Sequence, residues 1–168
     1  FLQASGALAG AALAGAMPLA RGVHAAGSDV IKIGLIGCGG RGSGAAANAM
    51  NAGNDIRLVA MADLFQDKVE GARKRLQAVK GAQVAVDADH MFSGFDAYQK
   101  VIDSNVDAVL IATTSHFHPR ILQAAVDAGK HVFCEKPHAL DAPGLKRVTA
   151  ICEQALTRGL CIVSGLHN

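Results

Sequence analysis

Residues 37–42 read Gly-Cys-Gly-Gly-Arg-Gly and directly follow the apolar run of residues 30–36. Glycines spaced as Gly37, Gly39 and Gly42, between a strand and a helix, are typical of a turn that holds a pyrophosphate. The first permits a tight turn, the second lets backbone amides approach the phosphates, and the third lets the helix pack closely on the strand. The free N–H groups of the helix start would then bind the anion. The alternative interpretation is a flexible glycine-rich loop.

Asp63 ends a second strand-like run, residues 56–62. It follows the last glycine by about twenty residues, the spacing at which a carboxylate reaches the adenosine ribose of a bound dinucleotide. A carboxylate there accepts from the 2′-hydroxyl and repels a 2′-phosphate, so the sequence predicts NAD. Lys68 lies close enough to leave NADP open. The alternative is a solvated Asp63 that caps the next helix.

Strand-like and helical segments alternate along the chain and must position these residues. Strands are expected at 30–36, 56–62, 83–86, 107–112, 131–134 and 160–164, and helices at 42–52, 66–79, 95–102, 119–128 and 141–158. The helical stripes place Val79, Leu145 and Cys152 toward the core. Alternation of this kind predicts an α/β fold, a Rossmann-type doubly wound parallel sheet with helices on both faces. Ligands bind at the carboxyl ends of such strands, so the candidate loops are 37–42, 63–66, 113–119 and 135–138.

The composition of the chain argues against two classes of function, nucleic-acid binding and metal binding. The chain has 168 residues, 51% of them hydrophobic and 18% charged, which suits one domain. A net charge of +2 without a basic stripe, and without tryptophan, argues against nucleic-acid binding. The cysteines lack metal-ligand spacing and are expected to be buried free thiols: Cys38, Cys134, Cys152 and Cys161. No metal site is predicted from the histidines either, because His116, His118 and His138 lack a carboxylate or cysteine partner at diagnostic spacing.

The first twenty residues carry no charge and are rich in alanine and glycine, and Arg21 and small residues follow. This pattern is typical of an export signal. A permanent membrane helix is the less favoured alternative, because alanine and glycine are only mildly apolar. Phe1-Leu2-Gln3 is similar to the part of a twin-arginine signal that follows its arginine pair. We therefore expect residues 1–27 to be a signal remnant, residues 28–168 to be a nucleotide-binding domain, and the protein to be periplasmic or secreted.

Two further runs carry a family resemblance. Ala112-Thr113-Thr114-Ser115-His116-Phe117-His118 follows one strand, and Gly129-Lys130-His131-Val132-Phe133-Cys134-Glu135-Lys136-Pro137 includes the next. Residues 29–168 resemble the nucleotide-binding domain of the glucose–fructose oxidoreductase and inositol dehydrogenase family (Gfo/Idh/MocA). In that family one strand ends in A-T-P-x-x-x-H and another run reads A-G-K-H-V-x-x-E-K-P. Thr114 departs from the family, which usually has proline there.

The resemblance implies an NAD site, with NADP possible. The implied cofactor-binding residues are Gly37, Gly39, Gly40, Arg41, Gly42, Asp63, Thr113, Thr114, His116, Glu135 and Lys136. Lys136 is also the implied catalytic residue, reaching both the nicotinamide and the substrate, where its charge would assist proton transfer from the reacting hydroxyl. His118 either contacts substrate or cofactor or only caps its helix. The resemblance further implies a cis peptide bond before Pro137.

The same resemblance implies a second α/β domain after His167-Asn168. That domain would supply an Asp and His acid–base pair, a sugar pocket and the interface of a homo-oligomer. The expected function is oxidation of a sugar, cyclitol or sugar derivative by hydride transfer to NAD(P), with this chain as the cofactor-binding half and inactive alone. The alternatives are an NAD-dependent glycosidase of the same superfamily and a non-catalytic dinucleotide-binding sensor.

Overall fold

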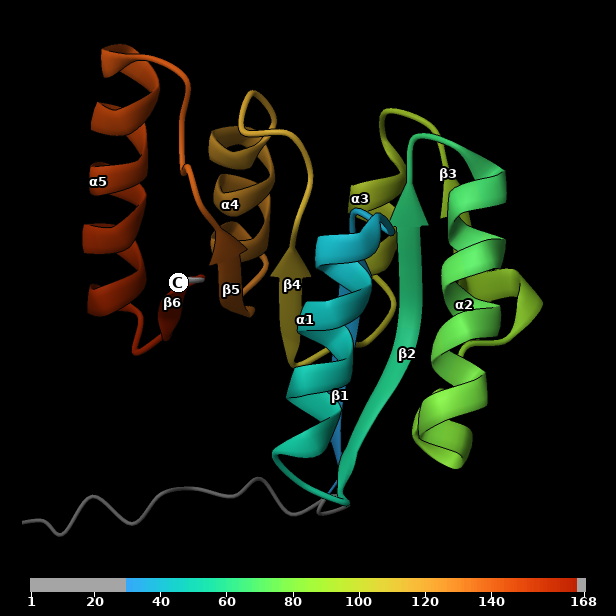
Figure 1. The fold of residues 1–168 in the computed structure, drawn as a ribbon. Helices are drawn as coiled ribbons and strands as arrows, with labels where there is room; N and C mark the ends of the chain where they lie inside the picture. Colours follow the sequence, from blue (N-terminus) through green and yellow to red (C-terminus); the bar gives the residue numbers. More distant parts are fainter. Residues whose placement is uncertain (1–29, 166–168) are drawn as a thin grey trace, which may run out of the picture.

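A computed structural model describes residues 30–165, in which six parallel strands form one sheet (Figure 1). The strands are β1 (Ile31–Ile36), β2 (Ile56–Asp63), β3 (Met91–Ser93), β4 (Ala108–Ile111), β5 (His131–Glu135) and β6 (Ile162–Gly165). Their order is β3-β2-β1-β4-β5-β6, and each pair of neighbouring strands is parallel. The predicted Rossmann-type sheet is thus confirmed. The strand order reverses between β1 and β4, where such sheets hold their ligands.

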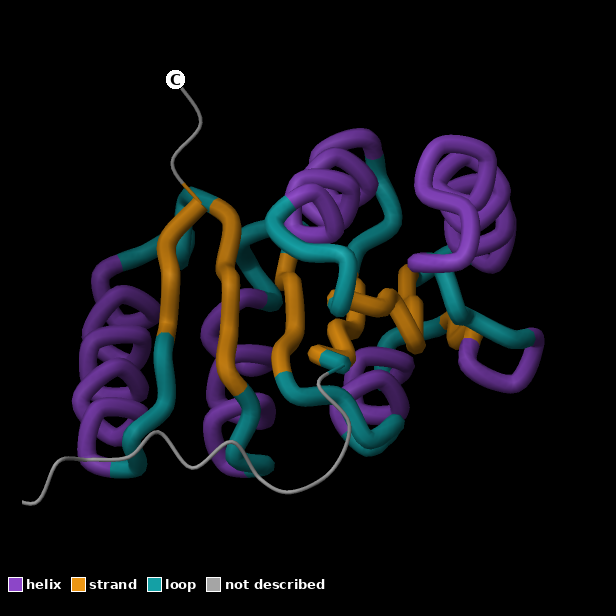
Figure 2. Tube along the Cα trace, turned by 90° about the horizontal axis from the view of Figure 1, so that it is seen from below, coloured by secondary structure: helices purple, strands orange, loops and turns teal. Residues whose placement is uncertain are grey.

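Helices cover both faces of this sheet (Figure 2). They are α1 (Gly40–Asn51), α2 (Gln66–Lys80), α3 (Ala97–Ile102), α4 (His118–Asp127) and α5 (Ala142–Thr157). One apolar cluster lies between the sheet and α1 and α2, and a second lies between the sheet and α3, α4 and α5. Successive strand residues point to opposite faces, so Leu35 joins the first cluster and Ile36 the second. Burial on both faces explains why the strands read as continuous apolar runs.

The segment between α2 and α3 differs from expectation. The strand predicted at 83–86 is wrong, because Gly81–Gln83 forms a short 3₁₀ turn and Val84 makes only an isolated bridge to Leu58. The edge strand is β3, further along the chain, where Met91 pairs with Met61 of β2. A three-residue edge strand is determined by the neighbour it pairs with, and its own sequence carries too little periodicity to predict it.

Three residues assigned to core-facing stripes lie on the surface instead. Val79 is 70% exposed and Leu145 56% exposed, and Cys152 is also exposed. Helical periodicity predicts which side of a helix faces the core. It does not predict how much of the helix length the sheet covers, so residues near a helix end can be exposed on that same side. Leu76 and Val148, one turn closer to the middle of the same helices, are buried.

The expected export signal, residues 1–27, lies outside the described residues, as do residues 28–29 and 166–168 of the expected nucleotide-binding domain. Within residues 30–165, no helix combines the length and the apolar character needed to cross a bilayer.

Candidate functional site

The glycine turn joins β1 to α1 at the carboxyl edge of the sheet. Gly37 has a φ of +99°, and a Cβ there would lie 2.5 Å from the Ala112 carbonyl oxygen. A Cβ on Gly42 would lie 1.9 Å from the Gly37 carbonyl oxygen, so only glycine lets α1 approach this closely. A Cβ on Gly39 would meet no heavy atom of residues 30–165 within 4 Å. The turn is therefore tight on its inner side and open at Gly39, as phosphate binding requires.

Among residues 30–165, no side chain caps the first turn of α1. Gly39 is the N-cap residue and, having no side chain, makes no side-chain cap for the amides that follow. Neither Asp nor Glu lies in this first turn. Unpartnered amides and the positive end of the helix dipole favour an anion at this position. Gly40 and Arg41 are exposed here, as a phosphate-facing turn requires.

Asp63 lies directly beside the glycine turn. Its Oδ2 accepts a hydrogen bond of 2.7 Å from the Cys38 amide, and its Oδ1 accepts one of 3.2 Å from the Phe65 amide. The α2 helix begins with Phe65 as its N-cap, so Asp63 supports this turn as well as the glycine turn. Each carboxylate oxygen retains a lone pair for a further donor. Asp63 is therefore held in the place where a ribose hydroxyl would donate to it.

A cavity of about 370 Å³ opens beside Asp63 at the ends of β1, β2 and β4. Its buried residues include Ile36 and Ala62, and aromatic side chains from three segments also line it: Phe65, Phe95, Tyr98 and Phe117. The Phe95 and Phe117 ring centroids lie 6.2 Å apart. An apolar, aromatic cavity beside a carboxylate suits a flat base attached to a ribose. Sequence reasoning missed these aromatic residues, although Phe65 follows Asp63 by two positions.

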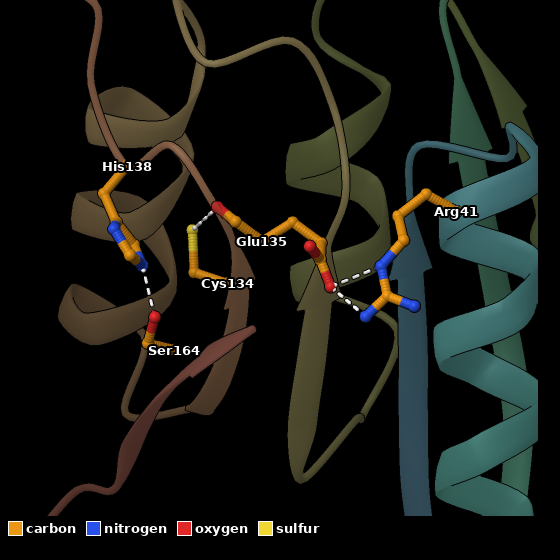
Figure 3. A network of polar contacts seen from close by, with 5 residues as sticks. All are labelled: Arg41, Cys134, Glu135, His138 and Ser164. Atoms are coloured by element: carbon orange, nitrogen blue, oxygen red, sulfur yellow. Dashed lines mark hydrogen bonds and ion pairs between the residues drawn. The ribbon is translucent and has the colours of Figure 1, made fainter. Parts of the chain in front are cut away.

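Glu135, the last residue of β5, is only 4% exposed, and it forms an ion pair with Arg41 from α1 (Figure 3). The Arg41 Nε donates to Glu135 Oε1 at 2.7 Å, and a second guanidinium nitrogen contacts the same oxygen. The hydrogen bond to Glu135 raises the pKa of Arg41 above its usual value. Both residues were predicted from the resemblance as cofactor-binding residues; the structure shows that they bind each other, and their contact with a cofactor stays a prediction.

Lys136 is exposed directly after β5, at the same edge of the sheet as the glycine turn. The predicted cis bond between Lys136 and Pro137 is confirmed. The following turn is tied to β6, because His138 Nε2 and Ser164 Oγ lie 3.0 Å apart in a hydrogen bond (Figure 3). Lys136 is therefore presented to solvent from an anchored turn.

His118, the first residue of α4, is 1% exposed. Its Nε2 lies 3.0 Å from the Thr113 carbonyl oxygen, which can only accept, so Nε2 carries the proton. Burial is the main cause that lowers the pKa of His118, and it favours the neutral form of the ring. This geometry supports a role in ordering the loop, and contact of His118 with a substrate stays a prediction. Thr114 and His116 are exposed on the loop, with the His116 ring edge-on to Phe117.

The cysteines divide into two classes. Cys38 and Cys134 are buried free thiols as predicted, and burial raises the pKa of each to about 12. Cys152 and Cys161 are free but exposed, so their predicted burial is wrong. Cys161 directly precedes β6, which lies at one edge of the described sheet. Within the described part of the chain, no three His, Cys, Asp or Glu side chains are grouped as metal ligands.

The residues present fit a dinucleotide. The open turn at Gly39 would take the pyrophosphate, Asp63 the ribose, and the aromatic cavity the base. Lys136 and the Arg41–Glu135 pair lie toward the other half of the sheet, where the second nucleoside of a dinucleotide would lie.

Comparison with known proteins agrees with this fit. Residues 31–162 match the model of the Gfo/Idh/MocA oxidoreductase family, NAD-binding Rossmann fold. The chain is 34% identical to an inositol 2-dehydrogenase of Klebsiella pneumoniae, over 70% of this chain and 32% of that protein. It is also 34% identical to a glycosyl hydrolase family 109 protein of Bacteroides fragilis, over 67% of this chain and 23% of that protein.

A solved structure shows the same fold with ligands. Scyllo-inositol dehydrogenase from Lactobacillus casei, with bound NAD(H) and scyllo-inositol, aligns with a TM-score of 0.63 and 27% identity. The alignment covers 81% of this chain and 36% of that one, so the chain spans about a third of the length of such relatives. The glycine turn, Asp63 and the family match lead to one conclusion: the chain belongs to the Gfo/Idh/MocA oxidoreductase family and contains its NAD-binding Rossmann domain.

Proposed function

We propose that the protein containing this chain oxidises a hydroxyl group of a sugar, cyclitol or sugar derivative, with NAD as hydride acceptor. The observation that best supports this proposal is that the open glycine turn, Asp63 and the exposed Lys136 lie at one edge of the sheet. The inositol dehydrogenases among the relatives support a polyol substrate. A cyclitol is the substrate class that we favour.

The chain's own residues have separate roles in this proposal. The amides at the start of α1 bind the pyrophosphate, and Asp63 accepts from the adenosine ribose and disfavours a 2′-phosphate. NAD, when bound, supplies the ring that accepts a hydride. Lys136 hydrogen-bonds the reacting hydroxyl and stabilises negative charge on its oxygen as the proton leaves. We propose that the acid–base pair and the substrate pocket lie in sequence beyond Asn168, and that this chain alone turns over no substrate.

The cofactor part of the proposal is tested by titrating the 168-residue chain with NAD in a calorimeter. Saturable binding is expected. Gly39→Val should weaken it at least tenfold, because the new side chain occupies open space where phosphates would approach. Gly44→Ala is the matched control, since a Cβ there also meets no heavy atom of the described residues and Gly44 lies one turn further into α1. If neither NAD nor NADP binds, the proposal is wrong.

The catalytic part is tested in the longer protein that contains this chain. Lys136→Ala should lower turnover of an inositol about a hundredfold or more, the usual effect of losing a positioned proton-transfer group. NAD affinity should stay within a few-fold, because the phosphates and the adenosine ribose are held elsewhere. Near-normal turnover by the variant would show that Lys136 is a bystander.

An NAD-dependent glycosidase is the second candidate, favoured by the similarity to the glycosyl hydrolase family 109 protein. The two functions differ in their products. Hydride transfer gives a carbonyl compound and NADH, whereas glycoside hydrolysis gives a free sugar and leaves the cofactor unchanged. Mass spectrometry of the product, together with absorbance of NADH, distinguishes them. A sensor without catalytic activity would give neither product.

We further propose that residues 1–27 direct export by a twin-arginine-type route to the periplasm, and that the longer protein is a homo-oligomer. The uncharged, alanine- and glycine-rich run supports the first proposal. Cell fractionation with and without residues 1–27 tests it, and cytoplasmic retention of both forms would contradict it. Sedimentation of the longer protein tests the second.

A further inference from the structure

The buried carboxylate of Glu135 is held from two sides. Arg41 donates to Oε1 from α1 (Figure 3). A Cβ on Gly165 of β6 would lie only 2.4 Å from the same oxygen. The backbone of β6 therefore lies against the carboxylate and leaves it little room to turn away. With Glu135 only 4% exposed, Arg41 is its close counter-charge in the structure.

The position of the pair relative to a bound dinucleotide follows from the topology and rests on the proposed function. Asp63 and the aromatic cavity mark the β1–β3 half of the sheet as the adenosine side. A dinucleotide spans the crevice between the two halves, so its nicotinamide half lies toward β4, β5 and β6. Glu135 ends β5 and immediately precedes Lys136, which places the ion pair on the nicotinamide side.

The charge of the nicotinamide ring differs between the two redox forms of the cofactor. The nicotinamide ring is positive in NAD⁺ and neutral in NADH, while the remaining charges of the two molecules are the same. A lone buried carboxylate beside the ring would favour NAD⁺, and a lone guanidinium would favour NADH. We propose that the Arg41–Glu135 pair sets the relative affinity for NAD⁺ and NADH, with Arg41 masking the buried charge of Glu135.

The other titratable side chains nearby contribute less to the charge near the nicotinamide ring than Arg41 and Glu135 do. Lys136 is exposed, so solvent screens its charge, whereas the Glu135 side chain is 5% exposed and Arg41 is held against it. Burial favours the neutral form of His118, and His138 Nε2 is hydrogen-bonded with Ser164 Oγ. The net charge felt near the ring therefore depends mainly on whether Glu135 and Arg41 are both present.

The test compares dissociation constants for NAD⁺ and NADH in the 168-residue chain. Arg41→Met should raise the ratio Kd(NADH)/Kd(NAD⁺) about tenfold, and Glu135→Gln should lower it about tenfold. The double variant should return to within a few-fold of the original ratio. For a two-electron couple, a tenfold change in the ratio corresponds to about 30 mV in the potential of the bound cofactor.

Two controls separate charge from structure. Arg41→Lys keeps the charge and should keep the ratio, and Arg57→Met removes a positive charge at the opposite end of β2, where Arg57 bonds to the Asn54 carbonyl. A purely structural role would weaken both redox forms equally and leave the ratio unchanged. Melting curves identify any variant that fails to fold. Should Arg41→Met do so, Glu135→Gln and Arg41→Lys still decide the question.

An unchanged ratio in Glu135→Gln, or a shift in the same direction in both single variants, overturns this inference. Absence of binding of either redox form to the unaltered chain would instead contradict the proposed cofactor site.

Discussion

Asp63 is the residue on which the choice of cofactor depends. Its carboxylate accepts from the Cys38 amide, so asparagine at this position keeps an acceptor while losing the charge. We expect the chain to bind NAD at least tenfold more tightly than NADP, an advantage of about 1.4 kcal/mol. Asp63→Asn should reduce that preference toward parity, because the repulsion of a 2′-phosphate is removed.

Calorimetric titration of both nucleotides measures this preference. Asp67→Asn is the matched control, since it removes an equal charge from the exposed first turn of α2. Equal affinities for NAD and NADP in the unaltered chain would show that the carboxylate does not select the cofactor.

His118 makes the stability of the fold depend on pH. Because burial lowers its pKa in the folded chain, the unfolded chain takes up a proton at a higher pH, near the ordinary value of about 6.5. Stability from His118 is therefore present above that value and is lost as the pH falls below it. The other titratable groups that act on the pKa of His118 are His138 and Glu135, and both are retained in a variant substituted at position 118.

His118→Gln provides the comparison, because its amide nitrogen can donate to the Thr113 carbonyl without titrating. We expect the unfolding free energy of the original chain to fall relative to that of the variant between about pH 7 and pH 5. Urea unfolding at several pH values measures it. Parallel pH profiles for the two proteins would assign the dependence to other groups.

At the scale of elements, contact between β1 and α1 requires glycine at one position. A Cβ on Gly42 would meet the Gly37 carbonyl oxygen at 1.9 Å, so Gly42→Ala must push the helix away from the turn. We expect a loss of about 1–3 kcal/mol of stability and weaker NAD binding. Gly44→Ala, in the same helix, meets open space and should stabilise the chain by about 0.5–1 kcal/mol.

Thermal unfolding of the two variants measures these opposite effects. If Gly42→Ala were as stable as the original chain, the close approach of α1 to the turn would not be required for folding.

At the scale of the whole molecule, residues 30–165 supply two apolar clusters and the cavity beside Asp63. We therefore expect deletion of residues 1–27 to leave the melting temperature and NAD affinity unchanged within error. Differential scanning calorimetry and NAD titration of the two forms measure this. A melting temperature lowered by more than a few degrees would show that the segment packs on the domain.

The sequence by itself determined the alternation of elements, the glycine turn, the place of Asp63 and the buried strands. Each of these depends on residues close together in the chain: Gly37 and Gly42 meet around one turn, and Asp63 ends its own strand. Local patterns of this kind carry enough information, because periodicity and turn chemistry act over a few residues.

Tertiary structure alone decided what distant segments do together. Arg41 and Glu135 are 94 positions apart, and nothing local to either shows that they pair. The aromatic cavity combines Phe65, Phe95 and Phe117 from three separate segments, and the edge strand β3 is selected by its pairing with β2. Burial of His118, like exposure of Val79, depends on which surfaces the packed sheet and helices cover, and only the assembled fold determines that.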